Sequence, residues 1–362
     1  MDELLQNTPS GLYCPAGDFY IDPHKPVRRA LITHGHADHI TWGCEKYLAA
    51  AAGEPIMRMR LQAGANLQLL QYREALKISG VTISFHPAGH ILGSAMVRIE
   101  HRGRVALITG DYKIADDPTC AAWEPVQCHL MVTETTFGLP VYRWPDPAKV
   151  QQQINDWWRS AREQGKCALL YGYAIGKSQR LLAMLDPAIG PIYCHGAVHK
   201  GNEAYREAGI ELPHAEYVAH TEKRDWAGAL VLAVPSAHRT RWSKRFGAST
   251  TASASGWMAV RGVRRRRSVD RGFVISDHVD WPSLLDAVSA CDPERIWTTH
   301  GYSDAVARYF REAGRDAQAL DGYMRSDNDE SPESWDGEGS AESRTSVSTD
   351  MSAEETAGSD AR

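Results

Sequence analysis

Hydrophobic and polar residues alternate with a period of two along much of the first third of the chain. The clearest case is VTISFHPAGHILGSAMVRIEHRGRVALITGDY (residues 81–112), which predicts several strands with HRGR as a hairpin turn. Three shorter segments are also expected to be strands: 17–23, 29–35 and 128–138. Between them, HADHITWGCEKYLAAAAG (36–53) is expected to continue as a helix. The first part of the chain is therefore predicted to be rich in β-structure.

The pattern changes near residue 146. DPAKVQQQINDWWRSAREQG predicts an amphipathic helix, and strands then alternate with helices up to about residue 260. Such alternation is typical of a parallel sheet covered by helices. The β-rich character returns after the basic run RGVRRRR. We therefore predict that 146–260 is a smaller α/β domain inserted between the two parts of a larger domain, 1–145 and 261–324.

The last segment of the chain, 325–362, differs from the rest in composition. It holds 11 Asp and Glu against 3 Arg and has almost no apolar residues. Such a segment buries too little surface to offset the entropy lost on ordering, so we expect a disordered acidic tail that aids solubility. The remaining 324 residues carry 37 Lys and Arg against 34 Asp and Glu, although the whole chain has a formal net charge of −5.

The sequence gives no sign of a membrane or secretory protein. It has no run of 18 apolar residues, and its first 17 residues lack the basic and apolar regions of a signal peptide. Its seven cysteines are scattered and odd in number, which favours free thiols. We therefore expect a cytoplasmic protein.

Residues that could bind metal ions gather in HGHADH (34–39), and others follow the ends of predicted strands. Imidazoles and carboxylates at this density form a ligand set for divalent cations, whereas a salt-bridged surface helix would mix Lys and Glu. Strand ends converge in α/β layers, so residues far apart in sequence can meet there. The candidates are Asp22, His34, His36, Asp38, His39, His90, Asp111, Glu134, Asp277, His278 and His300. Each isolated member could be structural, but the combination predicts a metal site.

These motifs resemble those of the metallo-β-lactamase superfamily. Its four core motifs match Asp22, HGHADH, AGH (with His90) and TGD (with Asp111). TETTFG with Glu134, ISDH with His278 and TTHG with His300 resemble the three further motifs of the nucleic-acid-processing β-CASP branch. Longer strings such as GLYCPAGDFYIDP and YAIGKSQR resemble the bacterial ligase-associated DNA exonuclease family, over about residues 10–324. The resemblance implies an α/β fold, a metallo-β-lactamase αββα sandwich with an inserted β-CASP-like domain.

The resemblance also implies how the ligands are shared between two divalent ions, Zn²⁺ or Mn²⁺. His34, His36 and His90 would hold the first ion. Asp38, His39 and His300 would hold the second, and Asp111 would bridge both. A hydroxide between the ions would attack the phosphodiester. Asp22 and Asp277 would support the ligands without binding metal.

A departing alkoxide needs a proton, and His278 is expected to donate it while Glu134 keeps the imidazole charged and oriented. Asp38 and Asp111 are counted with these two as catalytic residues. The alternative is that His278 is a structural group beside Asp277.

Two basic segments are candidates for binding substrate phosphates. YAIGKSQR places a glycine and basic residues between a predicted strand and helix, where backbone NH groups attract anions. The run RGVRRRRSVDRG could follow a nucleic acid backbone, although such runs are more often solvated surfaces. The candidates are Gly176, Lys177, Ser178, Arg180, Arg264, Arg265, Arg266 and Arg267.

The function implied by the resemblance is a DNA exonuclease in DNA repair, with a link to an ATP-dependent DNA ligase and helicase. One alternative is an RNA-processing nuclease of the same branch, since a histidine at the last motif, here His300, is common there. Another is a small-molecule hydrolase, which the inserted domain and the arginine run argue against. The third is a binding subunit with a decayed site, although every ligand position is filled.

Overall fold

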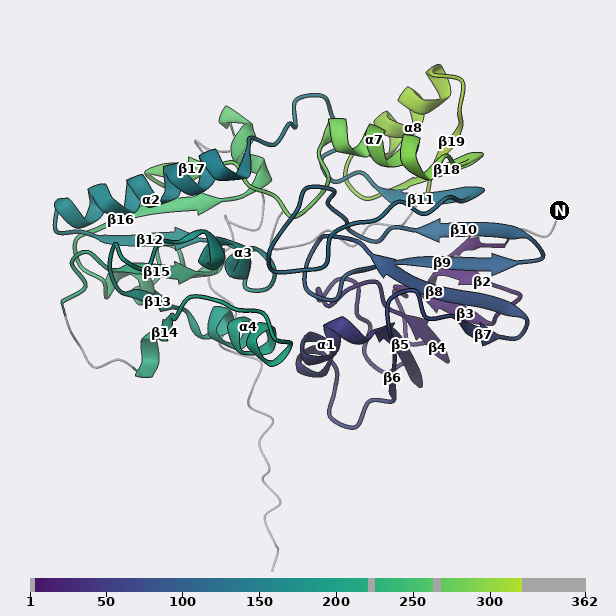
Figure 1. Ribbon diagram of the computed structural model, residues 1–362, viewed down its shortest axis with the longest axis horizontal. Helices are drawn as coiled ribbons and strands as arrows, with labels where there is room; N and C mark the ends of the chain where they lie inside the picture. Colours follow the sequence, from purple (N-terminus) through teal and green to yellow (C-terminus); the bar gives the residue numbers. More distant parts are fainter. Residues whose placement is uncertain (1–3, 221–224, 263–267, 321–362) are drawn as a thin grey trace, which may run out of the picture.

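The computed structural model describes residues 4–220, 225–262 and 268–320. The strands of these residues form three sheets. Figure 1 shows two lobes, with the first two sheets in one lobe and the third in the other. Arg264–Arg267 and the acidic tail predicted at 325–362 lie outside the described residues.

The first lobe is built from two sheets. One is formed by the N-terminal strands in sequence order: β1 (Gln6–Thr8), β2 (Gly11–Cys14), β3 (Phe19–Ile21), β4 (Arg29–Leu31), β5 (Lys46–Ala50) and β6 (Leu67–Leu70). The other has the order β19-β18-β11-β10-β9-β8-β7. Its strands are β7 (Leu76–Ile78), β8 (Val81–Pro87), β9 (Ala95–His101), β10 (Arg104–Ile108), β11 (Leu130–Glu134), β18 (Arg295–Thr299) and β19 (Asp316–Ala319).

Alternate side chains of the second sheet enter two different cores. On β10, Ala106 and Ile108 pack between the two sheets, whereas Val105 and Leu107 face the opposite side. That opposite side is covered by α7 (Trp281–Cys291) and α8 (Ser303–Glu312). The outer side of the first sheet packs against α1 (Glu54–Arg60). Because side chains alternate along a strand, both faces must be apolar, and four layers in the order αββα result.

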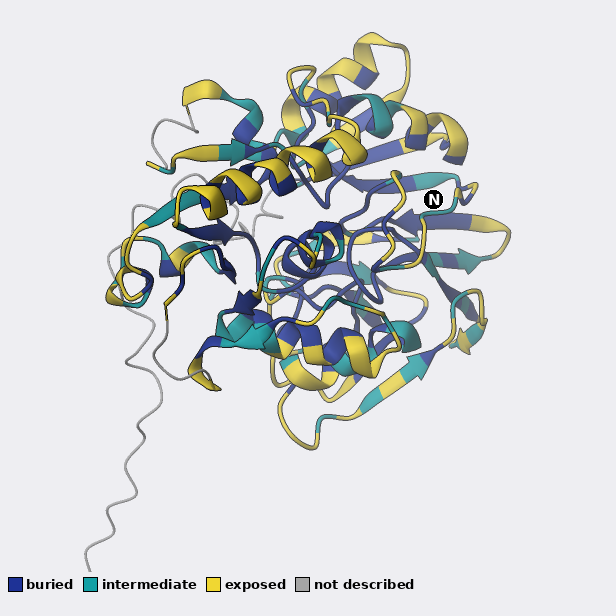
Figure 2. Ribbon diagram, turned by 60° about the vertical axis from the view of Figure 1, so that its left-hand side comes forward, coloured by how far each residue is buried: buried dark blue, intermediate teal, exposed yellow. Residues whose placement is uncertain are grey.

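The second lobe has one parallel sheet in the order β14-β13-β15-β12-β16-β17, with apolar cores on both faces. Its strands are β12 (Cys167–Tyr171), β13 (Ile192–Cys194), β14 (Glu216–Tyr217), β15 (Leu230–Ala233), β16 (Ser249–Ala254) and β17 (Arg271–Phe273). Its helices are α2 (Pro147–Glu163), α3 (Lys177–Met184), α4 (Gly196–Glu207) and α5 (Arg241–Lys244). Short 3-10 turns occur in the chain at Ala51–Gly53, Val218–His220, Pro235–Ala237 and Gly256–Ala259. Figure 2 shows buried residues concentrated in the strands and exposed residues on the outer faces of the helices.

The helix predicted over residues 36–53 is wrong. Residues 37–45 form turns, and Lys46–Ala50 is β5, which pairs with β4 and β6 in the first sheet. Tyr47, Leu48, Ala49 and Ala50 are all buried, as expected of an interior parallel strand with apolar residues on both faces. Tertiary packing thus outweighs the helical preference of alanine.

The second lobe also extends beyond the predicted boundary at residue 260. The strand β17 pairs with β16 in the third sheet, and Phe273 and Ile275 pack in its core. We therefore propose that the inserted domain runs from about residue 146 to 275. His278 then follows directly at the point where the chain returns to the first lobe.

The loop after β8 lies close to the segment that follows β5, and Gly93 of the loop contacts Gly53 of that segment. Gly93 has a φ of +76°, and a Cβ on it would lie 2.1 Å from the Cα of Gly53. The same loop carries His90, whose backbone NH donates to the hydroxyl of Ser94. The close contact between Gly53 and Gly93 therefore sets the position of the His90 loop.

Replacing Gly93 by alanine should reduce the free energy of unfolding, measured by chemical denaturation. The matched control is Gly103→Ala, because Gly103 has a φ of +77° but a Cβ added to it would meet no atom within 4 Å. Both variants carry the same backbone strain, so Gly93→Ala should cost about 1–3 kcal/mol more through overpacking. Equal losses would show that the contact with Gly53 can relax freely.

Candidate metal centre

The predicted site residues follow the carboxyl ends of strands, most of them in the two sheets of the first lobe and one, β17, in the second lobe. Each residue follows or ends a different strand: Asp22 (β3), His34–His39 (β4), His90 (β8), Asp111 (β10), Glu134 (β11), His278 (β17) and His300 (β18). Parallel strands direct their carboxyl ends to one edge, so residues 278 positions apart in sequence converge there. The fold thus brings together the candidates that the motifs identify.

The carboxylate of Asp111 lies at the centre of this cluster. It is 5% exposed. Its Oδ2 is surrounded by four imidazole nitrogens: His34 Nε2 at 3.5 Å, His39 Nε2 at 3.5 Å, His90 Nε2 at 3.7 Å and His278 Nδ1 at 3.9 Å. One carboxylate therefore contacts groups from both ends of the sequence.

Two groups of potential ligands share Asp111. The first contains His34, His36 and His90, and the second contains His39 and His300. Within each group, one ligand atom of every member lies within 4.8 Å of those of the others. Asp38 belongs to neither group, but its Oδ2 lies 3.5 Å from Nε2 of His39. Six of the seven predicted ligands thus fall into these two groups, Asp38 lies outside them, and the division between two ions stays a prediction.

The imidazole rings of His34 and His39 are oriented by Asp22 and Thr33. Asp22 accepts hydrogen bonds from the backbone NH of Thr33 at 2.9 Å, from its hydroxyl at 2.6 Å and from Nδ1 of His39 at 2.9 Å. Because the Thr33 hydroxyl donates to Asp22, it accepts from Nδ1 of His34 at 3.1 Å. In both histidines Nδ1 is thus the donor, and the lone pair of the neutral ring is on Nε2.

The imidazole rings of His36 and His90 are oriented by backbone carbonyls far along the chain. His36 Nε2 donates to the carbonyl of Ile175 at 3.2 Å, and His90 Nδ1 donates to the carbonyl of Asp277 at 2.8 Å. The remaining nitrogens, His36 Nδ1 and His90 Nε2, lie 3.1 Å apart. Their lone pairs therefore converge with those of His34 and His39.

The four convergent lone pairs fit divalent cations. Nε2 of His34 and of His39 are buried and have no hydrogen-bond partner, an arrangement that is costly unless another group is bound. Burial lowers the pKa of His34, His36, His90 and His300, which keeps the neutral, metal-binding form. Burial would also lower the pKa of His39, but the carboxylates of Asp38, Asp111 and Asp22 raise it well above its usual value. The nitrogen and oxygen donors suit several first-row metals, including Zn²⁺ and Mn²⁺.

Two of the site residues have strained backbones. Asp22 has a φ of +43° and His300 a φ of +56°, in the left-handed region that side chains other than glycine seldom adopt. The hydroxyl of Thr135 donates to the carbonyls of Thr299 and His300 at 3.0 and 2.5 Å and holds the latter turn. Such strain persists where the surrounding contacts impose it, which occurs often at functional sites.

His278 and Glu134 form a buried pair beside Asp111. Nδ1 of His278 donates to the two carboxylate oxygens of Glu134, at 2.9 and 3.1 Å. Glu134 also accepts from the backbone NH of Tyr112 at 2.9 Å, and Trp144 donates its indole NH to the carbonyl of His278 at 2.8 Å. With Nδ1 held by Glu134, a proton could be delivered only from Nε2. The same atoms, with Asp111, could also hold an ion.

The basic residues predicted to bind phosphate around Gly176 are buried between the lobes. Lys177 is fully buried 3.6 Å from Asp277, and Arg180 pairs with Asp277 at 3.2 Å and Asp117 at 3.3 Å. Burial would raise the pKa of Asp277, but Lys177, Arg180 and Lys113 lower it to about 2. Ser178 is also buried. In this structure the side chains of Lys177 and Arg180 hold Asp277, the residue whose carbonyl orients His90.

Sequence reasoning missed part of this network. Lys113 and Asp117 are both buried, and Lys113 donates to Asp117 at 2.8 Å. Their spacing of four residues was visible in the sequence, but it is common on exposed helices. Thr33, which links Asp22 to His34, was missed because a threonine between a strand and HGHADH carries no distinctive signal.

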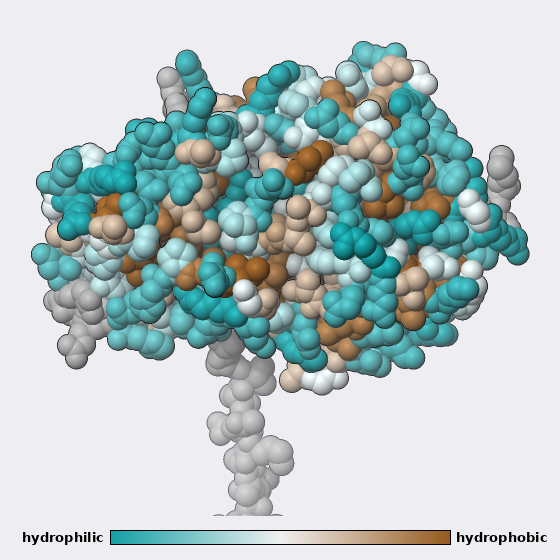
Figure 3. Space-filling view, viewed as in Figure 1, coloured by the Kyte–Doolittle hydropathy of each residue, from teal (hydrophilic) through white to brown (hydrophobic). Residues whose placement is uncertain are grey.

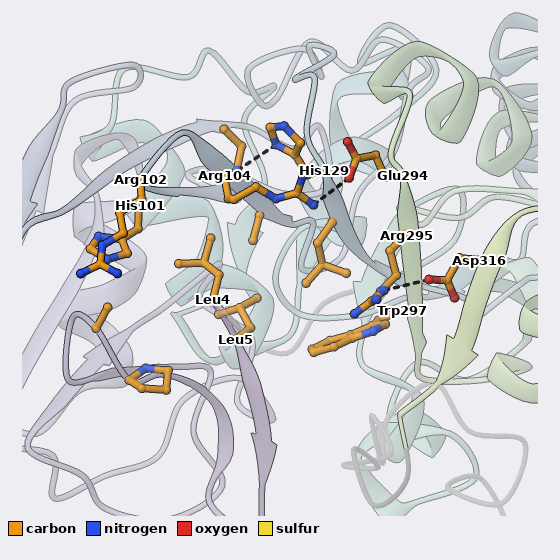
Figure 4. Close-up of a pocket in the computed structure, with 15 residues that line it drawn as sticks. Leu4, Leu5, His101, Arg102, Arg104, His129, Glu294, Arg295, Trp297 and Asp316 are labelled. Carbon is orange, nitrogen blue, oxygen red and sulfur yellow. Dashed lines mark hydrogen bonds and ion pairs between the residues drawn. The ribbon is translucent and has the colours of Figure 1, made fainter. Parts of the chain in front are cut away.

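A separate cavity of about 1040 Å³ lies at the opposite ends of the strands, where β10, β11, β18 and β19 begin. Figure 4 shows the ion pairs at its wall, Arg104 with Glu294 and Arg295 with Asp316, at 2.7 and 2.9 Å. It contains none of the predicted metal ligands. This cavity is therefore separate from the candidate metal site, despite its large volume.

Comparison with known proteins gives relatives whose names refer to the joining or cleavage of nucleic acids. A probable DNA ligase of Opitutus terrae is 33% identical over 315 residues, which are 86% of this chain but 30% of that protein. An RNase J-like protein of Methanocaldococcus jannaschii is 27% identical and covers 53% of this chain and 47% of its own. Cleavage and polyadenylation specificity factor subunit 3 of Dictyostelium discoideum is 30% identical over 33% of this chain and 16% of its own. The chain thus spans less than half the length of each.

Among solved structures, a protein of unknown function from Enterococcus faecalis V583 has a TM-score of 0.52 and 12% identity, over 81% of this chain and 78% of that one. This likeness concerns the fold alone. No family model matches the chain. No helix in the described parts of the chain is long and apolar enough to cross a membrane. The named relatives confirm the resemblance to the β-CASP branch of the metallo-β-lactamase superfamily, and the α/β fold agrees with it.

Proposed function

We propose that the protein is a metal-dependent nuclease that hydrolyses phosphodiester bonds as a DNA exonuclease in DNA repair. The observation that carries the proposal is that Nε2 of His34, His39 and His90 lies within 3.7 Å of Asp111 Oδ2, which is also 3.9 Å from the Glu134-bound His278. Ligands for two cations and a candidate proton donor thus share one carboxylate, an arrangement suited to phosphodiester hydrolysis.

The chain's own residues have distinct roles in this proposal. His34, His36 and His90 would hold one divalent ion, and Asp38, His39 and His300 the other, with Asp111 shared. When bound, such a pair of ions polarises the phosphodiester and supplies a nucleophile at neutral pH. Asp22 fixes two of the imidazoles, and the carbonyls of Ile175 and Asp277 fix two more.

His278 would protonate the departing oxygen. Its contact with both oxygens of Glu134 stabilises the charged imidazole and fixes the plane of the ring. Both side chains are buried, so bulk water competes weakly for these hydrogen bonds.

DNA is favoured as the substrate because the relative that matches 86% of this chain is named a probable DNA ligase. A segment similar to almost all of this chain is part of that protein, which supports a functional link to an ATP-dependent DNA ligase. The link to a helicase rests on the motif resemblance. RNA is the alternative, favoured by His300 and by relatives named RNase J-like protein and cleavage and polyadenylation specificity factor.

The function is tested by digesting end-labelled single- and double-stranded DNA and RNA with Mn²⁺ or Zn²⁺. A DNA exonuclease should shorten DNA stepwise from one end, whereas RNA should be cut far more slowly. Faster cleavage of RNA would favour the alternative. The control is Asp111→Asn, which should be inactive on every substrate because both ions lose their shared ligand.

The protein should bind two divalent ions per chain, measured by elemental analysis after reconstitution and removal of loosely bound metal. Asp111→Asn should lose most of this metal, because one neutral amide replaces the charged ligand of both sites. His101→Ala, which changes a histidine outside the cluster, should retain both ions. A ratio of one in the reconstituted wild type would contradict the two-ion arrangement.

His278→Ala should keep both ions but lower the rate on DNA by about 10²–10⁴, the usual contribution of a positioned proton donor. The loss should be much smaller on bis(p-nitrophenyl) phosphate, because nitrophenolate leaves without a proton. Glu134→Gln should show the same pattern more weakly. Loss of a metal ion in His278→Ala, or equal slowing on both substrates, would place His278 among the ligands or the positioning groups instead.

A further inference from the structure

Trp42 is an exposed tryptophan beside the metal-binding loop. Its exposed fraction is 58%, and the other large hydrophobic residues that are exposed in the described chain are Met59, Val141 and Tyr309. The surface seen in Figure 3 is mainly hydrophilic, with hydrophobic residues in smaller groups. An indole with most of its ring in solvent has no role in the cores described above, which suggests a role at the surface.

The position of the Trp42 ring is fixed by its surroundings. Its indole NH donates to the carbonyl of Arg60, at the end of α1, at 3.0 Å. The turn that carries it is held by Tyr47, whose hydroxyl donates to the carbonyl of Thr41 at 2.8 Å and accepts from the NH of Cys44 at 3.0 Å. The polar edge of the ring is therefore engaged with the protein, while the rest stays exposed in one orientation. Such pre-organisation lowers the entropy lost on binding.

Trp42 lies close to the candidate metal centre. It is four residues from Asp38, so their Cα atoms are at most about 14 Å apart. The same helix end contacts the metal loop, because Nε of Arg60 donates to the carbonyl of Gly35 at 3.2 Å. Within HGHADH the exposed residue is Ala37, and Asp38 is partly exposed. Trp42 therefore lies on the side of the loop that solvent reaches.

The residues around Trp42 suit a ligand that carries both negative charges and aromatic groups. Arg58, Met59 and Arg60 end α1, next to the carbonyl that Trp42 contacts. Arg58 pairs with Glu54, but the side chains are 61% and 40% exposed. Exposed ion pairs contribute little, so a phosphate can compete for the guanidinium. Figure 1 shows α1 beside α4 of the inserted domain, so this surface adjoins the junction of the lobes.

We propose that Trp42 is a stacking platform for an unpaired base of the substrate strand, which makes single-stranded nucleic acid the preferred substrate class. Both faces of a base are covered by its neighbours in a duplex, whereas a single strand can turn a base onto an aromatic ring. Arg58 and Arg60 supply positive charge for the adjoining phosphates. The inference rests on the proposed nuclease function, because Trp42 acts on the strand that enters that site.

The platform is tested by fluorescence anisotropy with labelled single-stranded oligonucleotides, using the full chain with Asp111→Asn to prevent cleavage. Adding Trp42→Ala should raise the Kd about ten-fold, within the range measured for loss of one base–aromatic stack. Adding Trp42→Phe should restore most of the affinity. An oligonucleotide whose residues are abasic should bind equally with and without Trp42, because it has no base to stack.

Tyr309→Ala is the matched control, since Tyr309 is an exposed aromatic residue on α8 and should leave the Kd unchanged. In the active enzyme, Trp42→Ala should raise the KM for single-stranded DNA but leave hydrolysis of bis(p-nitrophenyl) phosphate unchanged. An unchanged Kd for the oligonucleotide, or an equal loss for the abasic strand, overturns the platform while the nuclease function stands. A wild type that hydrolyses neither substrate overturns the nuclease function, and the platform falls with it.

Discussion

The arrangement of the site depends on one buried carboxylate. Asp111 lies at the start of the loop that follows β10 in the second sheet, and its Oδ2 lies within 3.9 Å of four imidazole nitrogens. A charge in this position is costly to bury unless positive charge compensates it. Burial would raise the pKa of Asp111, but His39 and His278 lower it well below its usual value. His39, whose own pKa is raised well above its usual value, is therefore a neighbouring imidazole that supplies positive charge to this anion.

The second structural requirement is that each imidazole presents the correct nitrogen. A neutral histidine has one donor and one acceptor, so fixing the donor fixes the lone pair. Asp22 and Thr33 do this for two rings, and backbone carbonyls of Ile175 and Asp277 do it for two others. The second set ties His36 and His90 to the second lobe, because Ile175 lies between β12 and α3 and Asp277 follows β17. The buried contacts of Arg180 and Lys177 with Asp277 secure that connection.

The sequence was sufficient for much of the fold and for the identity of the clustered residues. Period-two patterns located the strands of residues 81–108, and HGHADH identified one segment of the cluster, because both signals are local. The strand at Lys46–Ala50 was missed because alanine has little preference for strands. This segment becomes a strand because it pairs with β4 on one side and β6 on the other. Lys177 and Arg180 were predicted to bind substrate phosphate because their carboxylate partners, Asp117 and Asp277, are 60 to 100 residues away in sequence. Residue type predicts charge, whereas burial depends on which segments meet.

The hydrogen bonds from His36 and His90 to the carbonyls of Ile175 and Asp277 have a thermodynamic consequence. Any separation of the lobes that breaks them would free both rings to rotate and would weaken the hold on a cation. By linkage, a bound cation must then resist that separation by the same free energy. A cation bound at this centre and contact between the lobes would therefore favour each other to the same extent.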